Sequence, residues 1–134
     1  VSENVDINLA WENALQTDPI SAFGGIVAIN RELKADLAIK MKSLFLEVII
    51  APTVTDEALY IFADKPNIRI LKTGKIPNPM DNGFSMKSIS GGMLVQTRDN
   101  HILKKEDLKV VTKKLPNEDQ INDLLFQNVD LLRF

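Results

Sequence analysis

A double glycine preceded by serine and phenylalanine is the first candidate for a binding loop. The segment SAFGG, residues 21–25, lies directly before the apolar run IVAIN. Glycine permits positive φ, and because it has no Cβ a ligand can approach the backbone N–H groups. The segment therefore predicts either a loop that holds an anion or a planar heterocycle beside Phe23, or a tight turn that needs glycine for geometry alone. Spacing by itself favours the turn, since the segment is neither G-x-G-x-x-G nor G-x-x-x-x-G-K-[ST].

Glu47 is the second candidate, because it is the one charged residue of the apolar run LFLEVIIA, residues 44–51. An unpaired carboxylate is costly to bury. Glu47 must therefore lie at the exposed end of a strand, be paired, or bind a ligand rich in hydrogen-bond donors, such as sugar hydroxyls or an amino group. From the sequence alone, a solvent-exposed residue at a strand entry is an equally good interpretation.

Metal and nucleophile chemistry has little support in the composition. The chain has no cysteine and a single histidine, His101, which excludes disulfides, thiolate nucleophiles, iron–sulfur clusters and cysteine zinc sites. His101 follows the turn-forming pair Asp99 and Asn100, so we predict an exposed turn residue. Asp64, Asp81 and Asp99 show no metal-ligand spacing, and no metal site is predicted.

The charge balance argues against nucleic acids and membranes as partners. Sixteen basic and eighteen acidic residues give a net charge of −2, without the basic stripe that binding to a phosphate backbone needs. The sequence contains no run of about eighteen or more apolar residues, which is the length needed to cross a bilayer. The start at Val1 lacks the features of a signal peptide. The sequence predicts neither a nucleic-acid nor a membrane partner.

The elements that would position the two candidates alternate along the first half of the chain. Apolar residues at helical spacing predict one helix over 7–15, capped by Asn4 or Asp6, another over 37–45, and a third that follows Thr55 as N-cap. Short apolar runs predict strands buried on both faces at GGIVAIN and EVIIA, and an edge strand at NIRIL. This order predicts parallel strands joined by right-handed crossovers.

The second half of the chain is predicted to differ. Residues 73–84, with two prolines, two glycines and the turn pattern DNG, predict a long loop of the functional or mobile kind. The runs GGMLVQTRD and LKVVT predict two antiparallel strands that make the sheet mixed, and the glycine pair of SISGGMLVQ predicts a bulge or bend. A final helix opens on the capping box of Asn117 and Gln120. We therefore predict a single domain over residues 1–134, of the α/β class, with a mixed, largely parallel sheet and helices on both faces.

Four motifs in this order and at these separations resemble the bifunctional purine biosynthesis family: DPISAFGGIVAIN, FLEVIIAP, NIRIL and SGGMLVQTRD. The resemblance covers nearly the whole chain and lies in the aminoimidazole carboxamide ribonucleotide (AICAR) transformylase region, without the N-terminal IMP cyclohydrolase domain and the C-terminal part of the transformylase. It implies that the co-substrate 10-formyltetrahydrofolate gives its formyl group to the 5-amino group of AICAR, forming formyl-AICAR. It also implies a cytidine-deaminase-like fold, a homodimer and a cytoplasmic location.

The resemblance implies substrate-binding roles for particular residues. The Ser-Ala-Phe-Gly segment of the family corresponds to residues 21–24 here, which implies AICAR contacts through Ser21, Phe23 and Gly24. The acidic residue before the VIIAP strand corresponds to Glu47, which is implied to bind the nucleotide through its hydroxyl or amine donors. Deaminases of the related fold hold zinc with His and Cys ligands, and since this chain has no cysteine, we expect it to work without zinc.

No catalytic residue is predicted within the chain itself. The proton-transfer pair of the family, a Lys-His dipeptide, does not occur in the sequence and is expected upstream of Val1, with an asparagine near the reacting amine expected beyond Phe134. Formyl transfer to a weakly nucleophilic amine needs positioned acid and base groups, so the chain alone is predicted to be inactive. Two alternatives stay open: a non-catalytic nucleotide-binding module, and a dimerisation module whose apolar faces a partner covers.

Overall fold

In the computed structural model of the protein, residues 1–76, 78 and 81–133 are described. The chain divides into two compact units, Val1–Ile76 and Pro77–Phe134, each of which is described by itself. Part of the predicted 73–84 loop, at positions 77, 79 and 80, lies outside the described residues.

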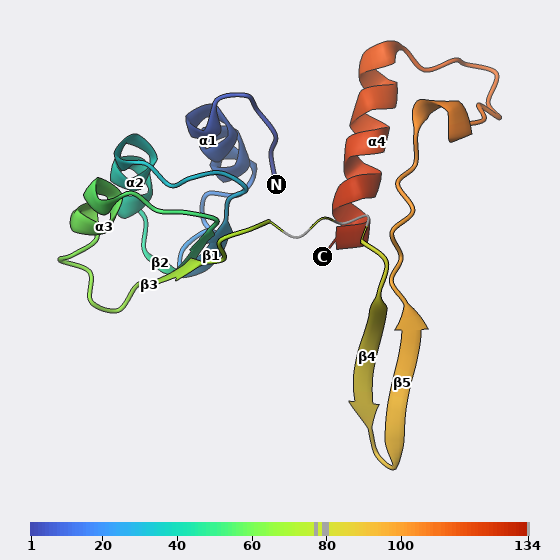
Figure 1. Ribbon diagram of the computed structural model, residues 1–134. Coiled ribbons are helices and arrows are strands. Elements are labelled where there is room, and N and C mark those ends of the chain that lie inside the picture. The colour runs from blue at the N-terminus through green and yellow to red at the C-terminus, as the bar shows by residue number, and fades with distance from the viewer. Residues whose placement is uncertain (77, 79–80, 134) are drawn as a thin grey trace. The chain divides into compact units, whose positions relative to one another are not determined.

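The first unit alternates helices and strands, as the sequence predicts. Its strands are parallel and lie in the order β1-β2-β3, so β2 is central and β3 is an edge strand (Figure 1). The elements in chain order are α1 (Ile7–Thr17), β1 (Gly25–Ala28), α2 (Ala35–Lys42), β2 (Leu46–Ala51), α3 (Asp56–Ile61) and β3 (Arg69–Lys72). The predictions of an α/β fold and of parallel strands are confirmed.

Local hydrogen bonds set the helix limits. The Asp6 carboxylate accepts the backbone N–H of Asn8 at 2.8 Å and caps α1, and the Thr55 hydroxyl accepts the N–H of Ala58 at 3.2 Å and caps α3. Both caps agree with the prediction. The prediction that the second helix runs on to residue 45 was wrong, because α2 ends at Lys42 and the chain turns into β2.

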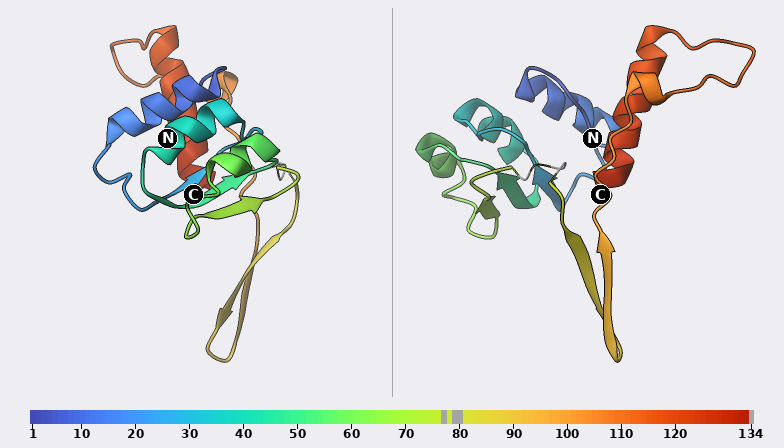
Figure 2. Two further views of the ribbon diagram at one scale, coloured as in Figure 1. Left: turned by 90° about the vertical axis from the view of Figure 1, so that its left-hand side faces the viewer. Right: turned by 45° about the vertical axis from the view of Figure 1, so that its right-hand side comes forward.

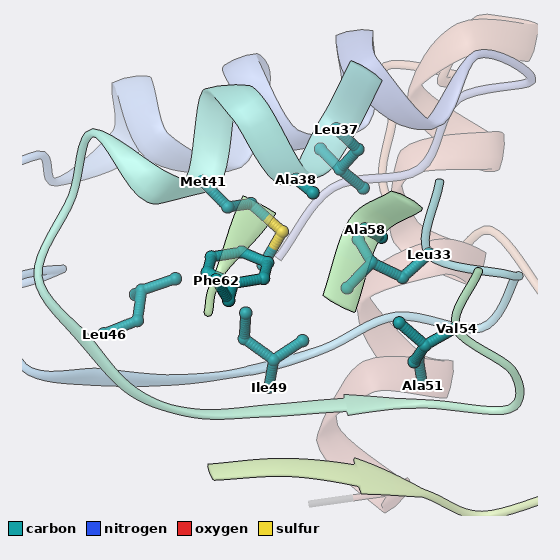
Figure 3. Packing of buried hydrophobic residues seen from close by; sticks show 10 residues of the cluster. All are labelled: Leu33, Leu37, Ala38, Met41, Leu46, Ile49, Ala51, Val54, Ala58 and Phe62. Carbon is teal, nitrogen blue, oxygen red and sulfur yellow. The ribbon is translucent and has the colours of Figure 1, made fainter. Parts of the chain in front are cut away.

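A cluster of buried apolar side chains lies between the helices and one face of the sheet (Figure 3). Figure 2 shows α1, α2 and α3 on this same face. Ten buried residues form the cluster, with Ile7 and Trp11 of α1 packed against it: Leu33, Leu37, Ala38, Met41, Leu46, Ile49, Ala51, Val54, Ala58 and Phe62. Burial of this apolar surface is the main source of stability in the first unit.

The opposite face of the three-stranded sheet is open in this unit. Ile26 of β1 is 68% exposed and Leu71 of β3 is 52% exposed. The prediction that GGIVAIN is buried on both faces was therefore wrong for this chain. The reason is physical: β1 is a sheet edge, and the helices of residues 1–76 all lie on the other face.

The second unit contains a β-hairpin and a long helix. Strands β4 (Phe84–Ile89) and β5 (Gly92–Thr97) are antiparallel and form a two-stranded sheet of their own. The 3₁₀ helix η1 (Lys105–Asp107) and helix α4 (Glu118–Arg133) follow. The side chains of Asn117 and Gln120 each accept the backbone N–H of the other, at 2.8 and 3.0 Å, which confirms the predicted capping box.

The hairpin corrects the predicted strand pairing. Residues 108–112, predicted as a strand, are not one, and the partner of β5 is the preceding segment 84–89. The loop between them consists of Ser90 and Gly91, with Gly91 at φ +81°. A two-residue turn with a glycine in the left-handed region closes a hairpin more readily than the longer connection that follows β5. The predicted single mixed sheet is thus a parallel sheet and a separate antiparallel pair.

Candidate functional site

The candidate loop begins with a carboxylate that fixes Ser21. Asp18, directly after α1, accepts the backbone N–H of Ser21 at 2.9 Å. This hydrogen bond, together with one from the Ser21 hydroxyl, lowers the pKa of Asp18 below its ordinary value. Ser21 is exposed but anchored at its backbone. Aspartate at the first position of a turn, followed by proline, is a sequence signal for such an arrangement.

Gly24 connects the loop to the start of the second strand. Its backbone N–H donates to the carbonyl of Phe45 at 2.8 Å, and its φ of +71° is a conformation that favours glycine. The rings of Phe23 and Phe45 pack with centroids 5.0 Å apart and planes tilted by 39°. The two sequence motifs that carry SAFGG and FLE therefore touch through both backbone and side chains.

Four of the five backbone N–H groups of residues 21–25 already donate to acceptors within the chain. The N–H of Phe23 donates to the carbonyl of Ile20 at 3.3 Å, and the N–H of Gly25 donates to the carbonyl of Ala22 at 3.1 Å. Those of residues 21 and 24 are occupied as described above. An anion nest needs free N–H groups that converge on the ligand. Of the two ligands considered for the loop, the planar heterocycle fits this geometry and the anion does not.

Phe23 has the exposure that a heterocycle platform needs. Its side chain is 69% exposed although it is apolar, and one side of the ring rests on Phe45. An exposed aromatic face attracts a planar π-system through dispersion and removal of apolar surface from water. The side of the ring that Phe45 leaves uncovered is available to a ligand.

Glu47 lies at an irregularity in the pairing of β1 with β2. Gly25 lies opposite Leu46 and Ile26 lies opposite Val48, so Glu47 is an extra residue with no partner on β1. Such a bulge redirects a side chain and is frequent beside functional sites. Glu47 is exposed, and within the described part of the chain no side-chain hydrogen bond or ion pair engages its carboxylate. Both of its oxygens are open to donors of a ligand.

The structure brings the predicted site residues to one end of the sheet. Gly24 is bonded to Phe45, and Glu47 follows two residues later at the start of β2. Ser21 and Phe23 belong to the turn that precedes β1. This is the amino end of the parallel strands, whereas open α/β sheets commonly bind ligands beyond the carboxyl ends.

Phe45 is the residue of this region that sequence reasoning missed. Its spacing from Leu37, Met41 and Leu44 fits a helical face and predicts a helical residue, whereas α2 ends at Lys42. The sequence carries a second indication, since Phe45 stands two residues before the unusual carboxylate of Glu47 in a strand-forming run. The hydrogen bond from the Gly24 N–H to the Phe45 carbonyl draws the chain into β2 at this point. This tertiary contact outweighs the helical spacing of the apolar residues.

Metal ligation and membrane insertion find no support in the described residues. No three His, Asp or Glu side chains among them are grouped so as to hold a metal ion. His101, whose N–H donates to Asp99 at 3.3 Å, is an exposed turn residue as predicted. No helix in residues 1–76, 78 and 81–133 has the length and apolar character required to span a bilayer.

These features define an α/β protein whose candidate site is an aromatic loop beside an unpaired carboxylate. The chain belongs to the AICARFT/IMPCHase bienzyme family, whose model matches residues 1–130. This finding confirms the family resemblance of the four motifs and assigns the chain to a family of purine biosynthesis enzymes.

Curated relatives agree with the family match. The bifunctional purine biosynthesis proteins PurH of Mesorhizobium japonicum and Brucella ovis are each 49% identical over 126 residues, which is 94% of this chain and 23% of the relative. The PurH protein of Rhizobium leguminosarum bv. trifolii is 50% identical over 117 residues, or 87% of this chain and 22% of the relative. The chain thus spans less than a quarter of the length of these relatives.

Proposed function

We propose that this chain carries part of the AICAR-binding pocket of a folate-dependent formyltransferase. The reaction transfers the formyl group of 10-formyltetrahydrofolate to the 5-amino group of AICAR and gives formyl-AICAR. The observation that carries the proposal is the contact of the Phe23–Gly24 loop with Phe45, two residues before the open carboxylate of Glu47. Membership of the AICARFT/IMPCHase bienzyme family supports the identity of the ligand.

Each proposed binding residue has a chemical role that matches AICAR. The Phe23 ring stacks on the planar imidazole base, and Gly24, whose φ of +71° favours glycine, places its backbone beside the base. The Glu47 carboxylate accepts hydrogen bonds from hydroxyl or amine donors of the nucleotide. Ser21 offers a hydroxyl at the rim of the loop. Because four of the five N–H groups of residues 21–25 are occupied, we place the nucleotide phosphate outside this loop.

Titration of AICAR into the isotope-labelled chain tests this pocket. We expect the backbone amide signals of Phe23, Gly24 and Glu47 to shift, while that of Gly74, which follows β3 at the carboxyl end of the sheet, stays in place. Glu47→Gln keeps one acceptor oxygen but removes the charge, and is expected to weaken binding by about tenfold. Shifts confined to Gly74 and its neighbours, or no shift at all, would contradict the proposal.

The chain alone is proposed to bind without catalysing formyl transfer. The 5-amino group is conjugated with the ring and flanked by a carboxamide, so it must lose a proton as the formyl carbon is attacked, and the departing folate nitrogen must gain one. The Lys-His dipeptide to which the resemblance gives this task does not occur in residues 1–134. We expect no formyl-AICAR when the purified chain is supplied with AICAR and 10-formyltetrahydrofolate, and measurable turnover would refute this part.

The chain spans less than a quarter of the length of its PurH relatives, which supports a larger fold around it. We propose that both compact units belong to one transformylase region with a cytidine-deaminase-like fold in which helices cover both faces of the sheet, and that this region works in the cytoplasm without zinc. The exposed apolar face of the three-stranded sheet, with Ile26 68% exposed, supports a second covering layer. In a protein of full PurH length, the backbone amides of β1, β2 and β3 are expected to be better protected against hydrogen exchange than in the chain alone.

A homodimer is the second part of the proposed assembly. The observation that favours it is the hairpin, whose strands β4 and β5 are exposed at every position although they carry large apolar side chains. Apolar surface of this kind is typical of interfaces. Sedimentation of a protein of full PurH length that contains this chain is expected to give a dimer. Substitution of Phe84 and Met93 by serine in that protein is expected to raise the fraction of monomer.

A further inference from the structure

The ring of Phe45 makes contacts beyond those that the proposed function assigns. It lies 5.0 Å from the Phe23 ring, centroid to centroid. A Cβ placed on Gly24 would lie 3.7 Å from Cε1 of Phe45, so the same ring also covers Gly24. The carbonyl of Phe45 accepts the Gly24 N–H at 2.8 Å. One residue thus holds two of the three proposed AICAR-contacting positions of the loop, Phe23 and Gly24.

An exposed aromatic side chain on a loop needs such a support in order to bind well. Phe23 is 69% exposed, so without a neighbour its ring would be free to change rotamer, and a ligand that stacks on it would have to immobilise it. A tilted ring pair at this separation is attractive beyond the burial of its area. The contact with Phe45 therefore orders the ring of Phe23 before any ligand arrives.

We infer that Phe45 is a positioning residue, which fixes the ring of Phe23 and the backbone of Gly24 in the orientation that receives the AICAR base. This inference rests on the proposed function and deepens it. Phe45 acts through its neighbours, since its own ring stands on the supporting side of Phe23. Its carbonyl is a backbone group, so substitutions of the side chain remove the ring contact and leave the hydrogen bond to Gly24 in place.

Two substitutions of Phe45 and one matched control test the inference in the complete 134-residue chain. Phe45→Leu removes the ring and is expected to weaken AICAR binding by about fivefold, the equivalent of about 1 kcal/mol of ring–ring contact. Phe45→Tyr keeps the ring and is expected to bind AICAR with the affinity of the wild type. Tyr60→Leu removes an aromatic ring from α3, 83% exposed, and is expected to leave the affinity unchanged.

The mobility of the Phe23 ring separates positioning from a purely structural role. In the free chain, Phe45→Leu is expected to increase the side-chain mobility of Phe23, measured by ¹³C relaxation, while the amides of α2 and α3 keep their exchange protection. A structural role alone would lower the unfolding midpoint and leave the affinity of the folded variant unchanged. Unchanged affinity of folded Phe45→Leu would overturn the inference.

The same experiment distinguishes failure of the inference from failure of the proposed function. If the wild-type chain gives no amide response to AICAR, the proposed function fails. The role of Phe45 in receiving the AICAR base then falls with it, and the ring mobility of Phe23 tests only the ordering of that ring by Phe45, which equal mobility in wild type and Phe45→Leu would overturn. If the wild type binds and Phe45→Leu binds equally well, the proposed function stands and the positioning role of Phe45 falls.

Discussion

The two compact units of the chain stabilise their strands in different ways. Every buried apolar side chain of the described residues lies in Val1–Ile76, where helices cover one face of three parallel strands. In Pro77–Phe134 both strands of the hairpin are exposed along their whole length. Parallel strands cannot pair without a crossover that also brings a covering helix, whereas a hairpin closes through a two-residue turn. The first unit is therefore held by its core, and the second by local pairing.

The largest expected effect is the loss of a core side chain. Leu37 of α2 is 1% exposed and Leu94 of β5 is 56% exposed. Leu37→Ala leaves a cavity and is expected to lower the free energy of unfolding by about 3 kcal/mol, while Leu94→Ala is expected to cost about 0.5 kcal/mol or less. Denaturant unfolding, followed at amides of β2 and β5, measures both. Equal costs would show that the hairpin also has a packed interior.

A pair of glycine substitutions gives the next largest contrast. A Cβ on Gly25, at the start of β1, would lie 2.9 Å from the carbonyl oxygen of Ala22, whereas nothing lies within 4 Å of one on Gly92 in β5. Gly25→Ala must displace backbone and is expected to cost about 2 kcal/mol, and Gly92→Ala is expected to be close to neutral. The unfolding midpoint of each variant measures the difference. A neutral Gly25→Ala would mean that the backbone of the candidate loop at Ala22 can shift at little cost in free energy.

The smallest expected effect is the change in the free energy of unfolding at acidic pH. Asp18, Asp36 and Asp64, all in the first unit, have pKa values lowered from the ordinary 3.8. For Asp36 the main cause is the Asn8 side-chain amide, which donates to its carboxylate at 2.7 Å. A carboxyl whose pKa is lower in the folded state stabilises that state at pH values above its ordinary pKa of 3.8. This contribution is lost as the pH falls below 3.8 and through the lower pKa of the folded state.

The acid effect can be measured with a variant that keeps the hydrogen bond. Asp36→Asn retains an acceptor for Asn8 but has no carboxyl to titrate. We expect the loss of unfolding free energy of the first unit between about pH 6 and about pH 3 to be slightly smaller in this variant than in the wild type. A variant as acid-sensitive as the wild type would assign the loss to other carboxylates.

Periodicity and capping predicted most of the first unit. Helical spacing around Trp11, and the capping oxygens of Asp6 and Thr55, depend on neighbours within a few residues, which a sequence displays directly. Which strands pair in the second unit was predicted wrongly. The segment FSMKSI mixes serine and lysine with apolar residues, so its strand character appears only once the turn at Ser90 and Gly91 is recognised.

The candidate site shows the same division between local and distant information. Unusual residue types in short runs made Phe23, Gly24 and Glu47 candidates, and the family resemblance added Ser21 and the binding roles. The contact that joins the two runs was not predicted. The ring pair of Phe23 and Phe45 joins residues 22 positions apart (45 − 23 = 22). Only the parallel pairing of β1 with β2 brings such residues together, and no local pattern encodes it.

The extra residue at Glu47 makes the length of this segment as important as its composition. Leu46 and Ile49 both point into the core although they are three positions apart, an odd spacing that a regular strand would place on opposite faces. Loss of a single codon between them would place these two core residues two positions apart, on the same face of a regular strand, and would remove the irregularity at Glu47. The reading frame and the core contacts would survive such a deletion, whereas the carboxylate would either be lost or be held on the face opposite the core.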